Sequence, residues 1–364
     1  MSNTQFTVLR QQRRERAREL MVQRGLAALL ISLPANRYYL SGFELHDPQP
    51  NESSGYLLLL EDGEDLLFTD SRYLEAARRL WKEDNIRIYK SLASSPQEIN
   101  RELAGKLTTG KSVGFEAKIM SVAFFEIFSR SIPVKPADGL VEELRVIKDA
   151  GELELMRETA RLNHRLMEYV PSLLVPGRTE IEIAWGIEQF FRNNGASENA
   201  FDPIVAVGPN GALPHAIPGN DQVREECPVL VDVGARLNDY NSDQTRSFWV
   251  GTKPTAEFSR ALEQVKEAQR LAIEAIKPGK RCADIYFVAR NSLAQEEVAK
   301  YFTHGLGHGV GLETHESPSL SPRSEQILAP GMIVTVEPGL YYPEWGGIRW
   351  EYMILVTENG CEVL

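Results

Sequence analysis

"PVLVDVGARLNDYNSDQTRSFWVG", residues 228–251, combines an apolar strand, a polar turn and a second strand. The first strand carries a carboxylate near its end, Asp232, and Asp243 directly precedes the second strand. A carboxylate in an apolar strand is costly to bury unless it is paired or bound to a metal ion. The stretch predicts that Asp232 and Asp243 face each other across a hairpin. Taken alone, Asp243 could also be an ordinary turn residue or a cap.

Two later strands repeat this arrangement. In "GMIVTVEPG", residues 331–339, Glu337 ends an apolar strand just before Pro-Gly. In "GGIRWEYMILV", residues 346–356, Glu351 has apolar neighbours, and the period of two places Arg349 on the same face. A single carboxylate of this kind could belong to an ion pair at a strand end. Several of them gathered in one core need cations to hold them.

Half of the histidines lie in one short stretch. The chain has six, and "THGLGHGVGLETHE", residues 303–316, contains His304, His308 and His315. Its four alternating glycines make a helix untenable, because each costs roughly 1 kcal/mol there. In an extended chain His304 and His308 would be about 13 Å apart, at about 3.3 Å per residue, too far to share one metal ion. At most one of them is therefore a ligand, and the glycines fit a backbone that packs closely against another sheet or a substrate.

One imidazole and four carboxylates form an oxygen-rich ligand set. Such a set suits two divalent ions bridged by carboxylates, with Mn²⁺, Co²⁺, Fe²⁺ or Zn²⁺ plausible. Two ions of this kind hold a hydroxide and polarise a carbonyl group, which is hydrolytic chemistry.

The rest of the chain predicts an α/β or α+β fold with two domains. Residues 1–140 alternate helices and strands and include a hairpin at 55–70, with Asp-Gly as its turn signal. A long amphipathic helix from about Ala150 opens a second domain at 145–364, which has two further helices near 255–276 and 282–298.

The composition is that of an ordinary globular protein and limits the choice of partners. The formal net charge of −11 argues against general nucleic-acid binding. Five arginines between Arg10 and Arg18 predict the solvated face of a first helix, with a phosphate or membrane patch as the alternative. No apolar signal core or membrane-spanning stretch is visible, so we expect a cytoplasmic protein without a membrane partner. The three scattered cysteines fit buried thiols in a reducing compartment.

The C-terminal half resembles the pita-bread metallopeptidases: Xaa-Pro aminopeptidase (aminopeptidase P), Xaa-Pro dipeptidase (prolidase) and, more distantly, methionine aminopeptidase. The likeness is strongest from "GPNGALPHA", at 208–216, onward, and "ANRYYLSGF" and "FTDSRYLEAA" extend it to the first 140 residues. It implies a creatinase-like α/β domain at 1–140, which serves dimerisation and the rim of the active site. A pita-bread catalytic domain at 145–364 would follow.

The family's metal-ligand motifs are all present. The segment "D-x-G-x-x-x-x-x-Y-x-S-D-x-T-R", the second histidine of "H-x-L-G-H", "V-E-P-G" and "R-x-E" each match. The resemblance implies that two divalent ions, with manganese favoured over cobalt, zinc or iron, are held by Asp232, Asp243, His308, Glu337 and Glu351.

The resemblance also implies further catalytic roles. Glu337 would move the proton between a metal-bridging hydroxide and the leaving amine. His215 and His315 would hold the substrate and stabilise the tetrahedral intermediate, and His304 would line the substrate pocket. Arg349 would brace the glutamate ligands from behind.

We therefore expect a homodimeric metallo-exopeptidase that cleaves the bond before a proline at position two of a peptide. Xaa-Pro aminopeptidase is the first interpretation, and a prolidase restricted to dipeptides is the alternative. A non-catalytic binding protein, a metal-free creatinase-like hydrolase and a methionine aminopeptidase fit less well.

Four residues remain to be placed. The family usually has Ile or Leu where this chain has Trp350, and Asp or Asn where it has Tyr352; both side chains should point away from Glu351. His164 is interpreted as structural. His46 would be an ordinary exposed histidine or part of a loop that reaches a partner's active site.

Overall fold

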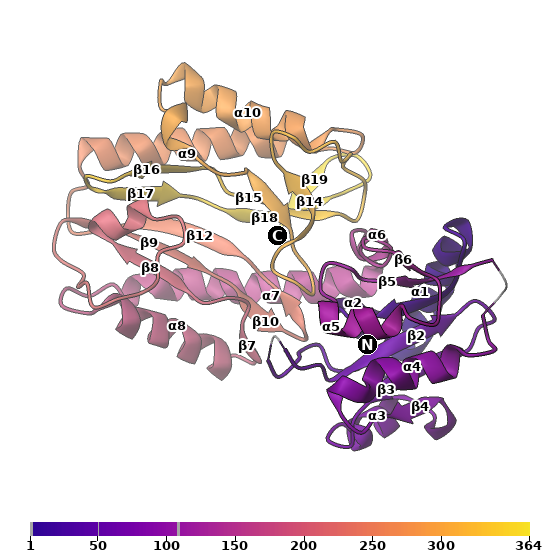
Figure 1. Cartoon of the computed structure of the whole chain (residues 1–364). Coiled ribbons are helices and arrows are strands. Elements are labelled where there is room, and N and C mark those ends of the chain that lie inside the picture. Colours follow the sequence, from indigo (N-terminus) through magenta and orange to yellow (C-terminus); the bar gives the residue numbers. More distant parts are fainter. Residues whose placement is uncertain (1–2, 50, 108–109) are drawn as a thin grey trace. The chain divides into compact units, whose positions relative to one another are not determined.

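The computed structural model describes residues 3–49, 51–107 and 110–364. The chain divides into two compact units, residues 1–145 and 146–364 (Figure 1). Each unit has buried hydrophobic clusters of its own, so each is built around its own core. Among the helices of the described residues, none combines the length and the apolar character of a membrane span.

The N-terminal unit contains a six-stranded mixed sheet with the order β4-β3-β2-β1-β5-β6. Its strands are β1 (Leu26–Ile31), β2 (Gly55–Leu60), β3 (Asp65–Thr69), β4 (Ile86–Ile88), β5 (Ser112–Phe115) and β6 (Val134–Pro136). Strands β2 and β3 pair antiparallel, which confirms the predicted hairpin. Strand β1 runs parallel to β5, so this unit mixes both kinds of ladder.

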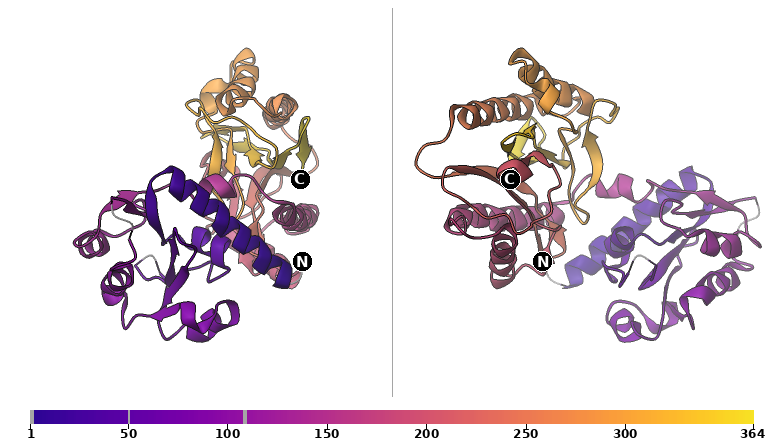
Figure 2. Two further views of the ribbon diagram at one scale, coloured as in Figure 1. Left: turned by 90° about the vertical axis from the view of Figure 1, so that its right-hand side faces the viewer. Right: turned by 60° about the vertical axis from the view of Figure 1, so that its left-hand side comes forward.

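Helices pack on the sheet of the N-terminal unit (Figure 2). The helices of this unit are α1 (Asn3–Gln23), α2 (Pro34–Ser41), α3 (Leu74–Leu80), α4 (Ser95–Leu103), α5 (Val122–Phe128) and α6 (Glu142–Arg145), with short 3-10 turns at Glu83–Asn85 and Leu92–Ser94. Of these, α1, α2 and α3 contact strands of the sheet. The predicted solvated arginine face of α1 is wrong in part. The side chains of Arg14 and Arg18 are mostly buried, and both pair with Asp65. An ion pair within the unit accounts for these two charges.

The C-terminal unit has strands in four sheets. Their orders are β12-β9-β8, β11-β10-β7, β14-β13-β15-β18-β19 and β16-β17. The strands are β7 (Glu198–Asn199), β8 (Ile204–Val207), β9 (Cys227–Val233), β10 (Ala235–Leu237), β11 (Tyr240–Asn241), β12 (Gln244–Val250), β13 (Gly307–Gly309), β14 (Glu316–Leu320), β15 (Ile333–Val336), β16 (Gly339–Tyr342), β17 (Gly346–Arg349), β18 (Tyr352–Val356) and β19 (Cys361–Val363).

Two pairs of helices cover these strands from outside (Figure 1). The helices are α7 (Ala150–Tyr169), α8 (Glu180–Asn193), α9 (Ala256–Ala275) and α10 (Cys282–Gln295), with 3-10 turns at Val170–Ser172, Gly208–Ala212 and Ala299–Tyr301. Helices α7 and α8 contact β10 and β8, whereas α9 contacts β15, β16 and β17. The strands therefore form the middle of the unit, between helical layers.

Candidate metal centre and active site

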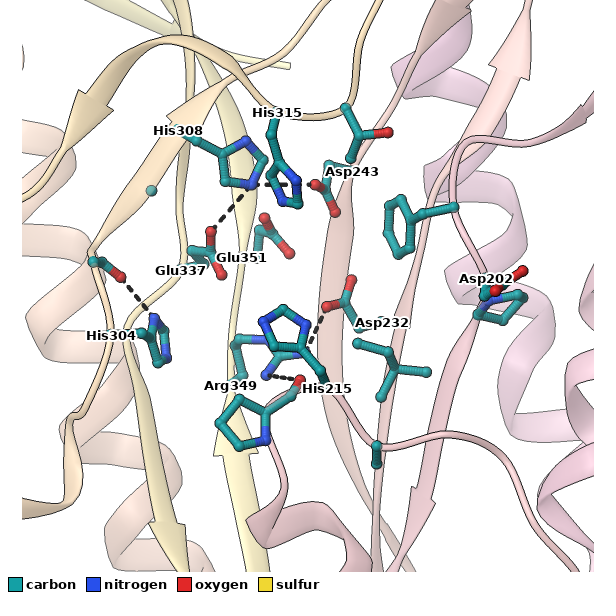
Figure 3. A pocket seen from close by; sticks show the side chains of 18 of the residues that line it. Asp202, His215, Asp232, Asp243, His304, His308, His315, Glu337, Arg349 and Glu351 are labelled. Carbon is teal, nitrogen blue, oxygen red and sulfur yellow. Dashed lines mark hydrogen bonds and ion pairs between the residues drawn. The ribbon is translucent and has the colours of Figure 1, made fainter. Parts of the chain in front are cut away.

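The five predicted metal ligands come from strand ends of the C-terminal unit. Asp232 lies on β9, Asp243 directly precedes β12, and His308 lies on β13. Glu337 follows β15, and Glu351 lies between β17 and β18. Figure 3 shows all five side chains pointing toward one common space, although up to 119 positions separate them in the chain.

The hairpin prediction for the two aspartates is wrong in its register. Strands β9 and β12 do pair antiparallel, but Asp232 lies opposite Thr245 rather than Asp243. A small second hairpin, β10 and β11, is inserted between them and turns at Asn238 and Asp239, both with positive φ. Asp243 therefore approaches Asp232 from the end of this insertion, outside the ladder.

Three of the five side chains come close enough to share a single ion. Ligand atoms of Asp243, His308 and Glu351 all lie within 4.8 Å of one another. His308 Nε2 is 3.6 Å from Asp243 Oδ2 and 3.3 Å from Glu337 Oε1. These distances place one imidazole nitrogen among three carboxylates.

Asp232 provides a test of whether the site fits metal ions. Its Oδ2 accepts a 2.5 Å hydrogen bond from Arg349, whereas its Oδ1 is buried and has no hydrogen-bond partner. Within the described ranges, Asp232 is the one side chain with such an unpaired buried atom that also lines the cavity described below. An unpaired carboxylate oxygen costs free energy when buried, so this donor set fits a bound cation.

Arg349 connects the carboxylates from behind. It is 2% exposed, and its Nε donates to Thr245 Oγ1 at 3.1 Å. The Thr245 hydroxyl in turn donates to Glu351 Oε2 at 2.6 Å. Arg349 Nη1 donates to the Tyr341 hydroxyl at 2.8 Å and to the Pro214 carbonyl at 3.2 Å. One buried guanidinium thus orients Asp232 directly and Glu351 through a threonine.

A second threonine links His308 to Glu337. The Thr335 hydroxyl accepts a hydrogen bond from the His308 backbone N–H at 3.0 Å and donates to Glu337 Oε1 at 3.1 Å. The Gly309 carbonyl lies 3.0 Å from His308 Nδ1, which leaves Nε2 to face the carboxylates. Such partners fix both the tautomer and the orientation of a ligating imidazole.

The gathered carboxylates raise one another's pKa. Burial, followed by the charges of Glu351 and Asp232, holds the pKa of Asp243 well above its usual range. Burial raises the pKa of Glu337 to about 7, although the Arg349 charge acts against the rise. Burial and the charges of Glu337 and Asp232 raise the pKa of Glu351 in the same way. Without cations the folded protein therefore retains protons on this cluster.

Burial has the opposite effect on the histidines. It lowers the pKa of His308, and it lowers the pKa of His304 to about 4 with help from the Arg349 charge. Burial and the neighbouring His308 also lower the pKa of His315. These three imidazoles are neutral at pH 7, which is the form that can bind a metal ion or accept a proton.

Two of the alternating glycines allow the histidine strand to pack closely on its neighbours. A Cβ at Gly307 would lie 1.9 Å from the Thr335 carbonyl oxygen, and one at Gly309 would lie 2.1 Å from the Ser317 carbonyl oxygen. The prediction of close backbone packing is confirmed for these two. At Gly305 a Cβ would meet nothing nearer than 3.5 Å, so that glycine has no such role.

The cluster lies in a cavity of about 550 Å³. His215, His304 and His315 line it together with the five predicted ligands and Arg349, so all the predicted site residues are brought together. The His304 and Tyr341 side chains share a 2.8 Å hydrogen bond. The ring centroids of His308 and His315 are 4.3 Å apart. An apolar wall comes from Phe201, Pro203, Ile204, Pro214, Ala216, Ile217 and Pro218, beside Asp202.

The two departures from the family pattern point away from this cavity. Neither Trp350 nor Tyr352 lines it, and both rings pack on Arg246, whose Cζ is 4.4 Å and 4.1 Å from their centroids. Arg246 also donates to the Glu351 carbonyl at 2.6 Å. The aromatic pair therefore supports the backbone of Glu351 through cation–π contacts with Arg246.

The other singled-out histidines lie outside the cavity. His164 Nδ1 lies 2.9 Å from Gln244 Nε2, and its Nε2 lies 2.9 Å from the Leu364 carbonyl oxygen, which agrees with a structural role. His46 is exposed, and its carbonyl accepts a hydrogen bond from Ser54. A contact of His46 with a partner's active site stays a prediction.

Sequence reasoning missed Thr335 and Tyr341. Thr335 lies two positions before Glu337, so the period of two could have placed it on the same face. Tyr341 follows the turn after Glu337 and carries no comparable signal, because its reach to His304 and Arg349 depends on how β16 pairs with β17.

The site and its scaffold are those of a two-domain metallopeptidase. Residues 154–358 match the metallopeptidase family M24, and residues 13–147 match the creatinase/prolidase N-terminal domain. The chain therefore belongs to metallopeptidase family M24. The predicted creatinase-like α/β domain followed by a metallopeptidase domain is confirmed.

Named relatives cover nearly the whole chain. An Xaa-Pro dipeptidase from Pyrococcus horikoshii is 33% identical over 95% of this chain and 94% of its own length. The structure of an Xaa-Pro dipeptidase from Bacillus anthracis has a TM-score of 0.89 at 32% identity, with 97% of each chain covered. That of an X-Pro aminopeptidase from Thermotoga maritima has a TM-score of 0.86 at 31% identity, with 96% of each chain covered.

Proposed function

We propose that this metallopeptidase hydrolyses the bond between an N-terminal residue and a following proline, with Xaa-Pro dipeptides as its main substrates. The observation that carries the proposal is one cavity that joins the four candidate carboxylate ligands, His308 and three further histidines. The dipeptidases among the relatives, which share about a third of their sequence with this chain, support the choice of substrate. This choice reverses the order of the expectations from sequence, which placed aminopeptidase P first.

We propose that two divalent ions are bound here, and we assign as their ligands the side chains of Asp232, Asp243, His308, Glu337 and Glu351. When bound, such ions activate a water molecule and polarise the scissile carbonyl. Oxygen-rich coordination favours manganese, with cobalt, zinc and iron also compatible.

The protein's own groups orient the reaction. Glu337 Oε1 is engaged by Thr335, so Oε2 is the oxygen that can take a proton and pass it to the leaving proline nitrogen. This transfer matters because that nitrogen belongs to a tertiary amide and carries no hydrogen of its own. His215 and His315 donate hydrogen bonds to the substrate and to the developing oxyanion. His304, held by Tyr341, shapes the pocket, and Arg349 keeps Asp232 in place.

A second candidate is an Xaa-Pro aminopeptidase that accepts longer peptides. Among the described residues that line the cavity, Arg349 is the one arginine or lysine, and four acceptors already engage it. A dipeptide presents a free proline carboxylate, which a cation would normally bind. In a longer peptide the proline has no free carboxylate. A cavity whose arginine already has other partners therefore also suits the longer substrate.

Product analysis by mass spectrometry separates these functions. Metal-stripped protein restored with Mn²⁺ is incubated with Ala-Pro and, in parallel, with Ala-Pro-Ala-Ala. Cleavage of Ala-Pro alone supports the dipeptidase, and alanine release from the tetrapeptide supports the aminopeptidase. If Mn²⁺, Co²⁺ and Zn²⁺ all leave both peptides intact, the proline specificity is wrong.

A matched pair of variants tests the site itself. Asp243→Asn should abolish cleavage without unfolding the protein, because it removes a central carboxylate. Asp284→Asn, at an exposed position on α10, should leave cleavage unchanged. Full activity in Asp243→Asn would show that the site is assigned wrongly.

A further inference from the structure

A buried glutamine on α9 contacts the backbone of both glutamate segments. Gln269 is 4% exposed and lies on the face of α9 that packs into the core. Its Nε2 donates to the Val336 carbonyl and to the Trp350 carbonyl, both at 2.8 Å. These two carbonyls belong to the peptide groups that lead directly into Glu337 and Glu351.

Gln269 binds the two segments just beyond the end of the sheet. Strands β15 and β18 pair antiparallel, and Val336 opposite Tyr352 is their last pair. Beyond this pair the two segments leave the ladder as they reach the glutamates. Backbone groups that leave a ladder inside a core need other partners. One side-chain amide supplies a hydrogen to each segment and thereby connects the two across the end of the sheet.

The opposite side of each peptide group is also held. The Glu337 N–H donates to the Leu306 carbonyl at 2.8 Å, and the Glu351 N–H donates to the Thr245 carbonyl at 3.2 Å. Both peptide groups are thus fixed by their N–H and by the carbonyl bound to Gln269. The amide then sets the separation of the two segments, on which the separation of the two carboxylates depends.

Packing alone does not explain a glutamine here. Apart from Gln264, the other core positions on α9 are apolar, including Val265, Ala268 and Ala272. An apolar side chain would fill the space without the cost of burying an amide. An amide, however, can satisfy two carbonyls at once, because its NH₂ group has two hydrogens.

We propose that Gln269 is a positioning residue of the metal centre, which fixes the distance between Glu337 and Glu351. It touches neither substrate nor ligand atoms and acts through the two backbone segments. The inference rests on the metal centre proposed above. Residues that orient ligands in this way typically change metal affinity by about 10–100-fold when replaced.

The chain offers a matched control five residues earlier on the same helix. Gln264 is also buried, at 9% exposure, but its amide donates to Glu296 Oε2 at 3.2 Å, away from the metal centre. Gln264→Met and Gln269→Met remove the same group from the same helix. Only the second change reaches the glutamate segments.

The experiment is a calorimetric titration of Mn²⁺ into metal-stripped protein, with the thermal midpoint of each variant recorded first. We expect Gln269→Met to weaken Mn²⁺ binding by about 10-fold or more, while Gln264→Met keeps the affinity of the unsubstituted protein. Gln269→Asn, whose shorter side chain cannot span both carbonyls, serves if the methionine variant does not fold; it should weaken binding in the same way.

Two results would overturn the inference. Unchanged Mn²⁺ affinity in the folded Gln269 variants would show that the amide does not position the ligands. An equal loss in Gln264→Met would show that any buried defect in α9 has this effect. If the unsubstituted protein binds no divalent ion at all, the proposed metal centre fails instead, so the two failures are distinguishable.

Discussion

Replacement of Arg349 by methionine tests whether charge balance holds the site together. Methionine is apolar and matches the aliphatic part of the arginine side chain, so the change removes the guanidinium and keeps the packing of that part. In the metal-free protein, Asp232 then loses its 2.5 Å partner, and the hydroxyls of Thr245 and Tyr341 lose a donor. Four gathered carboxylates would be left without a cation from the protein.

The expected cost follows from the burial of this pair. Side-chain exposure is 3% for Arg349 and 11% for Asp232, so solvent screens the interaction little. Removing one partner of a buried ion pair costs about 3–5 kcal/mol, because the remaining charge is left uncompensated. Bound divalent ions supply positive charge to the same carboxylates, so the loss should be smaller in the metal-loaded protein.

Urea unfolding of both forms at pH 7 measures this difference. Arg349→Met should lower the free energy of unfolding by about 3–5 kcal/mol without metal, and by clearly less with saturating Mn²⁺. Arg281→Met provides a control, because the ion pairs of Arg281 with Asp284 and Glu325 are exposed, and such pairs contribute about 0–1 kcal/mol. A loss below about 1 kcal/mol in metal-free Arg349→Met would refute the argument from charge balance.

Two further predictions concern pH and backbone packing. The pKa of Glu337 is raised to about 7 by burial, so between its ordinary value of 4.5 and about 7 the folded state binds more protons than the unfolded state. Burial lowers the folded-state pKa of His304, His308 and His315, which acts in the opposite direction over part of the same window. The metal-free protein should therefore lose more stability between pH 5 and 7.5 than its Glu337→Gln variant, and equal changes in the urea midpoints of the two proteins would contradict this. Gly307→Ala would place a Cβ 1.9 Å from a carbonyl oxygen and should cost about 3 kcal/mol or more in thermal or urea unfolding. Gly305→Ala, which has room, should be close to neutral, and equal losses in the two variants would contradict the packing argument.

Most of the proposed metal ligands could be predicted from sequence, because short local patterns mark them. A carboxylate at the end of an apolar strand is recognisable without a structure, and it marked Asp232, Glu337 and Glu351. The register of Asp243 could not be predicted, because the inserted β10–β11 hairpin shifts the pairing to Thr245. The sequence between the two strands reads as a polar turn and does not show that part of it forms a second hairpin.

Residues that act across the fold were beyond sequence reasoning. Gln269 lies 67 positions before Val336. From its neighbours in the chain, Gln269 cannot be told apart from an ordinary polar residue on a helix. Arg14 and Arg18 show the same limitation, because a basic run predicts a solvated face until β3 brings Asp65 to them. In both cases the partner is set by tertiary packing, which no local period encodes.

The charge of the cavity connects these observations to the reaction. The four carboxylates proposed as ligands, set against Arg349, leave an excess of three negative charges among these five side chains, and neutral His304, His308 and His315 do not offset it. Asp202, on the cavity wall, adds a fifth carboxylate. The raised pKa values of Asp243, Glu337 and Glu351 express this excess as retained protons. Two divalent ions would replace those protons and leave one positive charge on the four ligand carboxylates, Arg349 and the ions together, which suits the stabilisation of a developing oxyanion. The same carboxylates would thus bind metal ions more tightly as they lose their protons, so metal affinity should rise with pH over the window in which Glu337 loses its proton.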